Sequence, residues 1–410
     1  MAAKTQSLRF KRTIKASPAE VYRAFTHATA LRDWLAAAAA AQPRPGGHLY
    51  LKWSSGYAVH GDYTTLEPGK KISFTWHGTG EPAATRVQVS LAAVNGGTRV
   101  TLNHAGLGTG KAWKSAINQI SAGWETGLEN MQSVLEHGVD LREARTPRMG
   151  VFIDEFNPEV AIRLGVPVSL GSRLEGVAEG SGAQAAGLQK DDVIVRLGGK
   201  KISGFASLGP ALQGHQAGDM VPVVYYRGPE KHTVSMALSR RPDPPALPES
   251  GAALAERAQA VYAAFLDDMT QRLAGVSETE ADHRPAPNEW SLKELVAHFI
   301  ACERDLQSWI ADMVNDNTVG DSLEFRPNVN PRLAALVARY PTLPALLQEL
   351  RQSTQETLAL LRALPPEFVA RKHMFRRVAG WILFVVPSHL PDEHGAQVQA
   401  ALEAARQPAA

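Results

Sequence analysis

The first third of the chain alternates apolar and polar positions with a period of two and then changes to a helical period. Short strand-like runs separated by Gly and Pro cover residues 48–53, 58–66, 72–77, 86–91 and 99–104. The Asn95-Gly96-Gly97 turn between the last two runs is a strong hairpin signal. Apolar residues then recur every three or four positions from Ile117 to Leu135, which predicts one long helix. Residues 1–143 are therefore predicted to form a first domain of antiparallel strands closed by a helix.

A different pattern of small residues and short apolar runs predicts a second domain over residues 148–241. The stretch 180–201 holds a small-residue turn, a short helix at 183–186 and an apolar strand at 193–197. The pair Gly198-Gly199 then suits a tight hairpin, because glycine accepts positive φ without steric cost. A linker is predicted at 242–249, where four prolines make the chain extended and semi-rigid.

From residue 250 to 407 the apolar spacing is helical throughout. Amphipathic runs cover residues 254–273, 291–310, 343–364 and 378–406, the last one interrupted by Pro387 and Pro391. Ser291-Leu292-Lys293-Glu294 is a capping box that predicts the start of the second helix. Four such helices predict a bundle. The predicted fold class is thus multidomain α+β, with two sheet-containing domains before an all-α four-helix bundle.

Composition and charge narrow the range of partners and compartments. The formal net charge is +2 over 410 residues, which gives no support to a nucleic-acid or membrane-surface role. Cys302 is the single cysteine, so an intramolecular disulfide framework is excluded and a reducing compartment is favoured. No apolar run approaches the roughly 20 residues of a membrane span. We therefore expect a cytoplasmic protein with neither nucleic acid nor membrane as a partner.

Several strings in the first domain resemble one known family. SPAEVYRAFTHATALRDWL (17–35), PRPGGHLYLKW (43–53), LEPGKKISFTWHG (66–78) and GWETGLENMQSVLEHGVDLR (123–142) are similar to the activator-of-heat-shock-protein-ATPase family of the START-like (SRPBCC) superfamily. The resemblance implies a helix-grip fold with a cavity between sheet and helix, and a chaperone or a small apolar ligand as partner. The candidate cavity walls are aromatic, and the competing interpretation is that they fill the core. They are Trp34, Tyr50, Trp53, Tyr57 and Trp76.

The stretch GSGAQAAGLQKDDVIVRLGG (180–199) resembles the heart of an HtrA-like PDZ domain, a β-barrel-like fold, although Gly182 and Asp191 replace the usual proline and glycine. The resemblance implies a groove that binds C-terminal peptide tails as an added strand, with backbone N–H groups converging on the carboxylate. A groove that is blocked, or used only for packing, is the competing interpretation. The candidate peptide-binding residues are Arg148, Met149, Gly150, Val151, Phe152, Ile153, Leu208 and Leu212.

The strings NEWSLKELVAHFIACERDL (288–306) and SHLPDEHGAQV (388–398) resemble DinB-like bundles. The resemblance implies a divalent metal, zinc, nickel or iron, held by three histidines. His298 matches the first and His394 the last; His389 is the one candidate for the middle ligand. The gap between His389 and His394 is five residues, where family members usually have four. On a continuous α-helix that gap turns the side chains about 140° apart, so a bend or a helix start near Pro391 is required.

Cys302 lies four residues after His298 on the same predicted helix face and is a candidate soft ligand for zinc. The competing interpretation is a buried core thiol, with the histidines filling the bundle interior. No nucleophile–base pair, phosphate loop or dinucleotide fingerprint occurs, so no catalytic residue is predicted. The sequence favours a multidomain binding or adaptor protein, with a link to stress responses. The alternative is a metal-dependent DinB-type enzyme, a thiol transferase or isomerase, acting through the C-terminal bundle.

Overall fold

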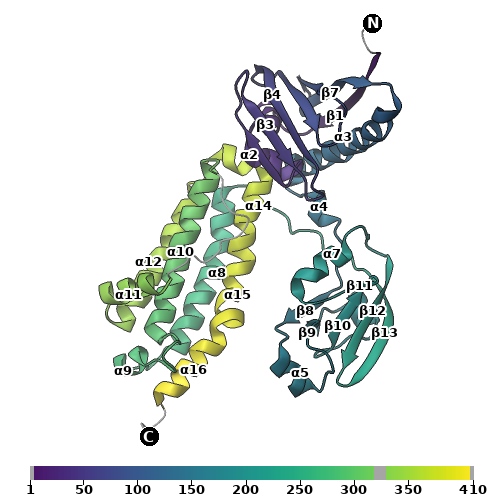
Figure 1. The fold of residues 1–410 in the computed structure, drawn as a ribbon. Helices are drawn as coiled ribbons and strands as arrows, with labels where there is room; N and C mark the ends of the chain where they lie inside the picture. The colour runs from purple at the N-terminus through teal and green to yellow at the C-terminus, as the bar shows by residue number, and fades with distance from the viewer. Residues whose placement is uncertain (1–3, 318–328, 407–410) are drawn as a thin grey trace. The chain divides into compact units, whose positions relative to one another are not determined.

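The computed structural model describes residues 4–317 and 329–406 and divides into two compact units. The first unit joins two separate segments, Met1–Gly138 and Ala246–Ala410, and the second unit is Val139–Pro245. An antiparallel sheet domain, a second sheet domain and a helical region follow one another along the chain (Figure 1). The predicted multidomain α+β class is therefore confirmed.

The N-terminal domain is a seven-stranded antiparallel sheet in the order β1-β7-β6-β5-β4-β3-β2, which packs against one long helix. Its helices are α1 (Pro18–Thr26), α2 (Ala28–Trp34) and α3 (Lys111–His137). The capping box that opens α1 is present: Glu20 N–H donates to Ser17 Oγ, and Ser17 N–H donates to Glu20 Oε2 at 2.8 Å. The strands are β1 (Thr5–Ile14), β2 (Ala38–Ala41), β3 (His48–Lys52), β4 (Ala58–Glu67), β5 (Lys71–Gly78), β6 (Thr85–Val94) and β7 (Gly97–Gly108).

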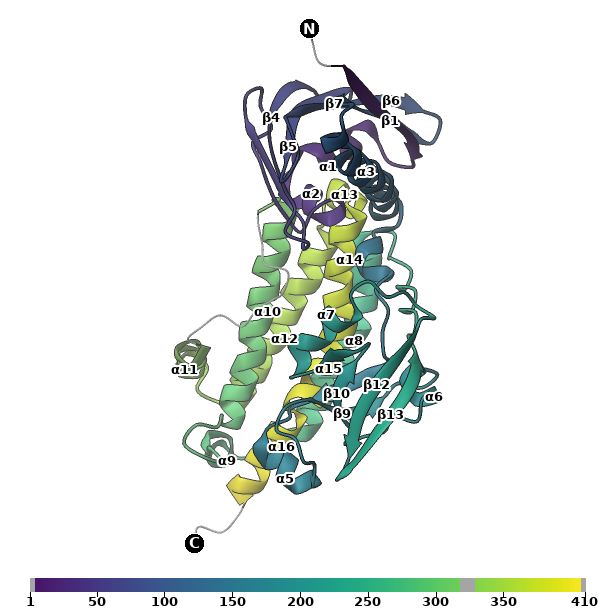
Figure 2. The ribbon, with the colours of Figure 1, turned by 45° about the vertical axis from the view of Figure 1, so that its right-hand side comes forward.

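The C-terminal segment is helical (Figure 2). It buries two apolar clusters between its long helices. The second long helix, α10, starts at the Ser291–Glu294 capping box, as the sequence predicts. Its first ten residues are all buried, so it forms the centre of the bundle. The helices before the last run are α8 (Gly251–Arg272), α9 (Glu278–Asp282), α10 (Leu292–Val314), α11 (Val329–Arg339), α12 (Leu343–Arg362) and α13 (Pro366–Ala370).

The last helical run continues through both prolines instead of breaking at them. It consists of α14 (Lys372–Gly380), the π-helix η2 (Trp381–Val385), α15 (Val386–Ser388), the π-helix η3 (His389–His394) and α16 (Gly395–Arg406). Pro387 and Pro391 have no N–H to donate to the helix, and each ring crowds the carbonyl four residues earlier. Wider π turns accommodate these two defects, as π-bulges do elsewhere.

Basic residues of α14 contact the C-terminal end of α3 inside the first unit. Lys372 Nζ donates to the carbonyl of Glu136 at 2.7 Å, and Arg376 donates to the carbonyl of His137 at 2.7 Å. The last carbonyls of a helix lack internal partners, and cations are favoured there by the helix dipole. The N-terminal domain and the helical segment therefore share a polar interface.

The second unit is a six-stranded sheet with the order β13-β12-β10-β9-β8, and β11 pairs with β10. Gly182 takes the place of the proline that is usual in PDZ domains. An added Cβ there would lie 1.7 Å from the Ala237 carbonyl oxygen, and the Gly182 N–H, which proline lacks, donates to Ser239 Oγ. Asp191 has φ 70 and pairs with Arg173, so it occupies the left-handed conformation that glycine usually supplies. The strands are β8 (Val151–Asp154), β9 (Ser172–Val177), β10 (Val193–Leu197), β11 (Lys200–Lys201), β12 (Met220–Arg227) and β13 (Glu230–Ala237). The helices are α4 (Leu141–Ala144), α5 (Pro158–Leu164), α6 (Gly182–Ala185), the 3-10 helix η1 (Phe205–Ser207) and α7 (Leu208–Leu212).

Candidate functional sites

Three imidazoles converge inside the helical bundle. His298 comes from α10, while His389 and His394 are the first and last residues of η3. His394 Nε2 lies 3.1 Å from His298 Nε2 and 3.1 Å from His389 Nε2. The structure therefore brings all three predicted ligands together, with His394 Nε2 next to both other Nε2 atoms.

The π-helix is what overcomes the five-residue gap between His389 and His394. In a π-helix each turn closes an i→i+5 hydrogen bond, so residues five apart lie about one turn from each other. On an α-helix the same two side chains would point about 140° apart. The sequence required a bend or a helix start at Pro391, and the structure provides a widened turn instead. The signal that could have revealed it is the pair of prolines four residues apart within one apolar helical pattern.

A hydrogen bond fixes the tautomer of one imidazole. His394 Nδ1 lies 2.6 Å from Gln397 Oε1, and a carbonyl oxygen can only accept, so Nδ1 carries the proton and Nε2 keeps its lone pair. Metal-binding histidines typically donate their second N–H to such a partner. Burial, together with the neighbouring imidazoles, lowers the pKa of His298 to about 3 and that of His389 to about 4. Both side chains are therefore neutral at neutral pH, the form in which imidazole binds metals.

The cluster has the size of a tetrahedral zinc site. Zinc lies about 2.0–2.1 Å from nitrogen, so two nitrogens at tetrahedral vertices are separated by roughly 3.3 Å. The two Nε2–Nε2 distances of 3.1 Å are close to that edge. Aromatic rings enclose the cluster: Trp290 lies 4.9 Å from His298 between ring centroids, and Phe299 lies 5.1 Å from His389. The residues present thus fit a divalent metal in donor type and spacing.

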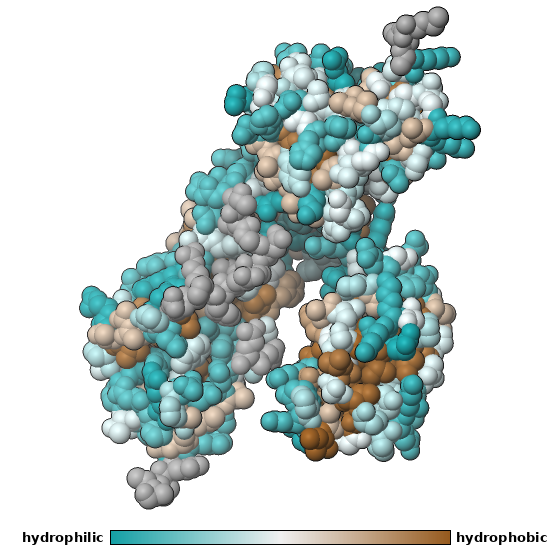
Figure 3. Space-filling model, in the orientation of Figure 1, coloured by the Kyte–Doolittle hydropathy of each residue, from teal (hydrophilic) through white to brown (hydrophobic). Residues whose placement is uncertain are grey.

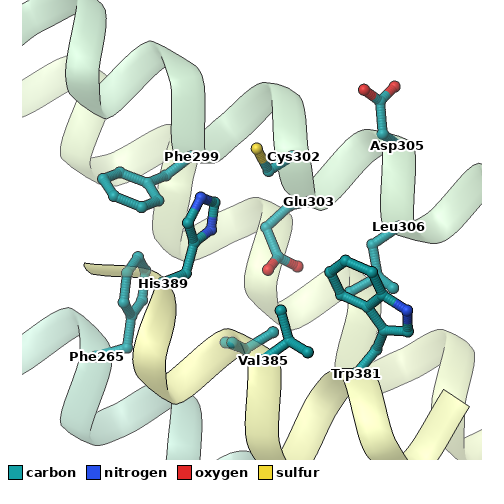
Figure 4. Close-up of a pocket in the computed structure, with 10 residues that line it drawn as sticks. Phe265, Phe299, Cys302, Glu303, Asp305, Leu306, Trp381, Val385 and His389 are labelled. Carbon is teal, nitrogen blue, oxygen red and sulfur yellow. The ribbon is translucent and has the colours of Figure 1, made fainter. Parts of the chain in front are cut away.

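A small cavity of about 60 Å³ adjoins His389 (Figure 4). Glu303 is buried in its wall, where Tyr262 and Thr357 hydroxyls donate to Glu303 Oε2 at 3.0 and 2.7 Å. Burial raises the pKa of Glu303 to about 7. Nothing in the sequence marks this carboxyl group as special, because Glu303 lies within an ordinary helical pattern. The cavity is lined by Phe265, Phe299, Cys302, Glu303, Asp305, Leu306, Trp381, Val385, Val386 and His389.

A larger cavity of about 490 Å³ lies in the N-terminal domain, between the sheet and α3. Trp53, Tyr57 and Trp76 are among its walls, together with Trp124. The carboxylate of Glu81 holds two of these side chains in place. It accepts hydrogen bonds from the Tyr57 hydroxyl at 2.5 Å and from Trp76 Nε1 at 3.1 Å. The cavity is therefore an aromatic cup with one anchored carboxylate.

The structure places the two remaining aromatic candidates away from this cup. Trp34 is 1% exposed and donates from Nε1 to the Ala24 carbonyl, so it belongs to the core. Tyr50 alternates with the buried Leu49 and Leu51 along β3 and contacts the ring of His60. Strand alternation therefore turns Tyr50 to the other face of the sheet.

In the second unit, β8 is the edge strand of the sheet, because it pairs with β9 alone among the described strands. Val151 and Ile153 on β8 pack against the same cluster as Leu208 and Leu212 of α7. An unpaired strand edge beside a helix is the geometry that accepts an added peptide strand.

The other predicted peptide-binding residues occupy three different environments. Met149 is 4% exposed and lies in the core, and Phe152 is 57% exposed on the opposite face of β8 from Val151. Arg148 forms an isolated bridge to Ser239, which anchors the start of the loop. Gly150 has φ 79, and an added Cβ would lie 2.1 Å from the Ser181 Cβ, so glycine is required there.

Hydrophobic side chains gather on the face of the second unit seen in Figure 3. The large apolar side chains that stay exposed in this unit are Phe152, Ile162, Leu170, Phe205 and Met220. No helix within residues 4–317 and 329–406 is long and apolar enough to cross a membrane.

Three family models match the chain in the predicted order. Residues 15–136 match the activator of Hsp90 ATPase homolog 1-like protein family, residues 138–238 the PDZ domain and residues 262–398 the DinB superfamily. The resemblances drawn from the sequence are therefore confirmed for all three domains.

The curated relatives match the PDZ region. A probable periplasmic serine protease do/HhoA-like protein of Haemophilus influenzae is 31% identical over 108 residues, 26% of this chain and 22% of that protein. Periplasmic serine endoprotease DegP of Salmonella typhimurium is 27% identical over 154 residues, 36% of this chain and 32% of that protein. The chain thus spans between about a fifth and a third of the length of these relatives.

Solved structures similar to this chain include the following two. The solution structure of the Aha1 dimer from Colwellia psychrerythraea is 21% identical, with a TM-score of 0.29, over 32% of this chain and 98% of that chain. A crystal structure of an HSP90 activator from Plasmodium falciparum is 23% identical, with a TM-score of 0.28, over 32% of this chain and 95% of that chain.

Proposed function

We propose that this protein is a multidomain binding protein, an adaptor, whose PDZ domain captures the C-terminal tails of other proteins. The observation that carries the proposal is the free edge of β8 beside α7, with Val151, Ile153 and Leu212 half-buried along it. Main-chain hydrogen bonds to the strand edge supply affinity, and apolar contacts select the tail. The match of residues 138–238 to the PDZ family supports this role. The single cysteine fits a reducing compartment, and we propose the cytoplasm.

A peptide experiment tests the groove in the full-length chain. Apolar C-terminal peptides with a free carboxylate should be enriched from a library, and the same peptides with amidated ends should bind at least about tenfold more weakly, because a charge-assisted hydrogen bond contributes roughly 1.5–3 kcal/mol. Leu212→Glu should abolish binding by placing a like charge beside the tail. Phe152→Ser is the matched control, since its side chain lies on the other face of β8, and it should bind normally. Equal recovery of free and amidated tails would rule out the proposed groove.

The aromatic cup of the N-terminal domain gives the adaptor a second binding site. Its volume of about 490 Å³ lies in the range of small-molecule pockets, and its walls are mainly apolar. We propose a small apolar ligand as its occupant, with a chaperone as the competing partner that the family match suggests. An apolar fluorescent probe should bind the wild type and lose affinity in Glu81→Gln, because the neutral amide is a weaker acceptor for Tyr57 and Trp76.

The metal centre supports a second candidate function, a metal-dependent thiol transferase or isomerase of the DinB type. Two observations favour it: the convergence of His298, His389 and His394, and the cavity that reaches His389. These three residues would hold the ion. A divalent ion bound there supplies Lewis acidity that can polarise a substrate or hold a thiolate. Phe265, Phe299 and Trp381 exclude water from the cavity wall, and the buried Glu303 can hold or release a proton.

Metal analysis separates this candidate from a purely structural bundle. The full chain should bind about one divalent ion, and His298→Ala should lose it. His283→Ala is the matched control, because His283 ends the short helix α9 and lies outside the cluster. Two results together would rule out the metal-dependent enzyme. The wild type would bind no divalent ion, and a chelator would leave the thermal stability of the wild type and of His298→Ala equally unchanged.

A further inference from the structure

One carboxylate stands among the aromatic rings of the cup in the N-terminal domain. Glu81 lines the cavity of about 490 Å³ together with Trp53, Tyr57, Trp76 and Trp124. Trp53 has its ring centroid 5.3 Å from that of Tyr57 and 6.2 Å from that of Trp76. The Trp76 and Trp124 centroids lie 5.2 Å apart, so the four rings form a continuous wall. Among the described residues that line the cavity, Glu81 is the one that carries a formal charge.

The turn after β5 builds this carboxylate into the wall. Glu81 N–H donates to the Gly78 carbonyl at 3.0 Å, and Gly78 N–H donates to Glu81 Oε2 at 2.9 Å. The other oxygen, Oε1, accepts from the Tyr57 hydroxyl and from Trp76 Nε1. A Cβ added to Gly78 would lie 2.1 Å from the Tyr57 hydroxyl oxygen and 2.4 Å from Glu81 Oε1. Position 78 therefore has to stay without a side chain for the carboxylate to meet the rings.

The negative charge of Glu81 has no counterion within residues 4–317 and 329–406. The three donors to its oxygens are a backbone N–H, a phenol and an indole, all of them neutral. Burial, together with the hydrogen bond to Glu81, raises the pKa of the Tyr57 hydroxyl, so Tyr57 keeps its proton. A partly buried charge is favourable only when it is compensated. A cation that enters the cup would supply this compensation.

We propose that the ligand of the cup is a free organic ammonium ion with apolar substituents, such as a quaternary ammonium compound. The inference rests on the proposed ligand site of the N-terminal domain and names the chemical class of its occupant. A cation within about 6 Å of an aromatic centroid is attracted by the quadrupole of the ring, and tryptophan attracts it most strongly. The alkyl groups on the nitrogen supply the apolar surface that such a cavity buries.

The order of affinities distinguishes this ligand from a neutral apolar compound of the same shape. Water solvates an alkylammonium ion better than its neutral isostere, so a cavity with purely apolar walls binds the neutral compound more tightly. A carboxylate beside tryptophan rings reverses the order, because both attract the positive charge in a partly buried site. Preference for the cation over its isostere therefore reports the charge of Glu81.

Choline and 3,3-dimethylbutan-1-ol are the matched probes, because the positive nitrogen of choline is a neutral carbon in the alcohol. In isothermal titration calorimetry the full-length chain should bind choline about tenfold more tightly than the alcohol. Glu81→Gln should remove most of this preference, since the amide keeps the size of the carboxylate without its charge. Glu67→Gln is the matched control and should keep the preference, because Glu67 is exposed at the end of β4 and does not line the cavity.

A ring variant separates the aromatic contribution from that of the carboxylate. Trp53→Leu keeps an apolar side chain in the wall and should weaken choline by about threefold or more, with a smaller effect on the alcohol. Circular dichroism in the near-ultraviolet establishes that the variants are folded.

Two results would overturn the ammonium ligand and leave a neutral occupant of the cup standing. They are equal or weaker binding of choline than of the alcohol in the wild type, and an undiminished preference in Glu81→Gln. A trimethyllysine peptide that bound more tightly than choline would overturn the assignment to a free small molecule. If choline, the alcohol and the apolar fluorescent probe all failed to bind the wild type, the proposed ligand site itself would fall.

Discussion

At the scale of single residues, His104 is a buried imidazole whose protonation state is fixed by its neighbours. It is fully buried on β7 in the core of the N-terminal domain. Trp124 Nε1 donates to His104 Nδ1 at 3.0 Å, so the ring proton sits on Nε2, which faces Thr85 Oγ1 at 2.7 Å. Thr85 Oγ1 in turn donates to the Trp76 carbonyl. In this hydrogen-bond network both ring nitrogens of His104 have suitable partners only while the imidazole is neutral.

This network predicts a pH dependence of stability. Burial lowers the pKa of His104 to about 4, below the value near 6.5 of an exposed histidine. Below about pH 6.5 the unfolded chain therefore binds a proton that the folded chain does not. The free energy of unfolding should fall as the pH decreases from about 6.5 towards 4, by up to about 3 kcal/mol.

Denaturant unfolding at a series of pH values measures this effect. His104→Gln should remove the part of the pH slope that belongs to this residue. The exposed His60→Gln should keep the wild-type slope. Identical slopes in the wild type and His104→Gln would show that the imidazole does not carry the effect.

Residue type alone predicted the surroundings of only some of the aromatic candidates of the N-terminal domain. Trp53 and Tyr57, from the turn between β3 and β4, and Trp76 on β5 line the cup. Trp34 and Tyr50 are of the same type but lie elsewhere. Tyr50 differs from the cup residues because strand alternation turns its side chain to the other face of the sheet, and Trp34 differs because its Nε1 reaches the Ala24 carbonyl. Local amino-acid composition predicts neither feature. Glu81, which orients the cup, could not be recognised because its partners come from other positions in the chain.

At the scale of elements, the π-helix η3 is what brings His389 and His394 together with His298. The sequence predicts all three histidines but only an α-helical period, on which His389 and His394 diverge. In the structure a π turn next to Pro391 brings the two histidines together. This turn forms because Pro391 has no N–H to donate, and the packed helix widens locally where that hydrogen bond is missing. The capping boxes at Ser17 and Ser291 were predictable because they depend on residues within one turn.

Restoring the missing N–H should weaken metal binding. Pro391→Ala allows a regular α-helical turn, which rotates His394 away from His389. We expect metal affinity to fall by about tenfold or more, while helix propensity increases. Competition with a chromophoric chelator measures the affinity of the full chain.

Pro344→Ala is the matched control for this experiment. Pro344 lies in the first turn of α12, where no intrahelical hydrogen bond is lost, so metal affinity should not change. Equal affinities of the wild type, Pro391→Ala and Pro344→Ala would show that the widened turn is not needed to assemble the ligands.

At the scale of the whole molecule, the chain builds one unit from two distant segments. Residues 1–138 and 246–410 form a compact unit, and residues 139–245 form another. Inside the first unit, Asp316 pairs with Arg371 at 3.1 Å and with Arg23. These half-buried charges, together with the contacts of α14 to the end of α3, join the N-terminal domain to the bundle.

This division predicts two thermal transitions in calorimetry, one for each unit, although the sequence contains three family matches. Asp316→Ala should lower the transition of the first unit, because two arginines lose their shared carboxylate, and should leave the other transition unchanged. Asp219→Ala, in the second unit, is the converse control. Three separate transitions would mean that the N-terminal domain and the bundle unfold independently.

Because residues 139–245 are inserted between the two segments of the other unit, the PDZ domain is covalently tethered to that unit at both of its ends. A polypeptide captured by its last residues on β8 would meet any second binding surface of the same chain at an effective concentration on the order of millimolar, because both surfaces belong to one molecule. Contacts with dissociation constants of up to about a millimolar would then be substantially populated. Capture of a tail by one domain can thus deliver a client to the others without any change of shape.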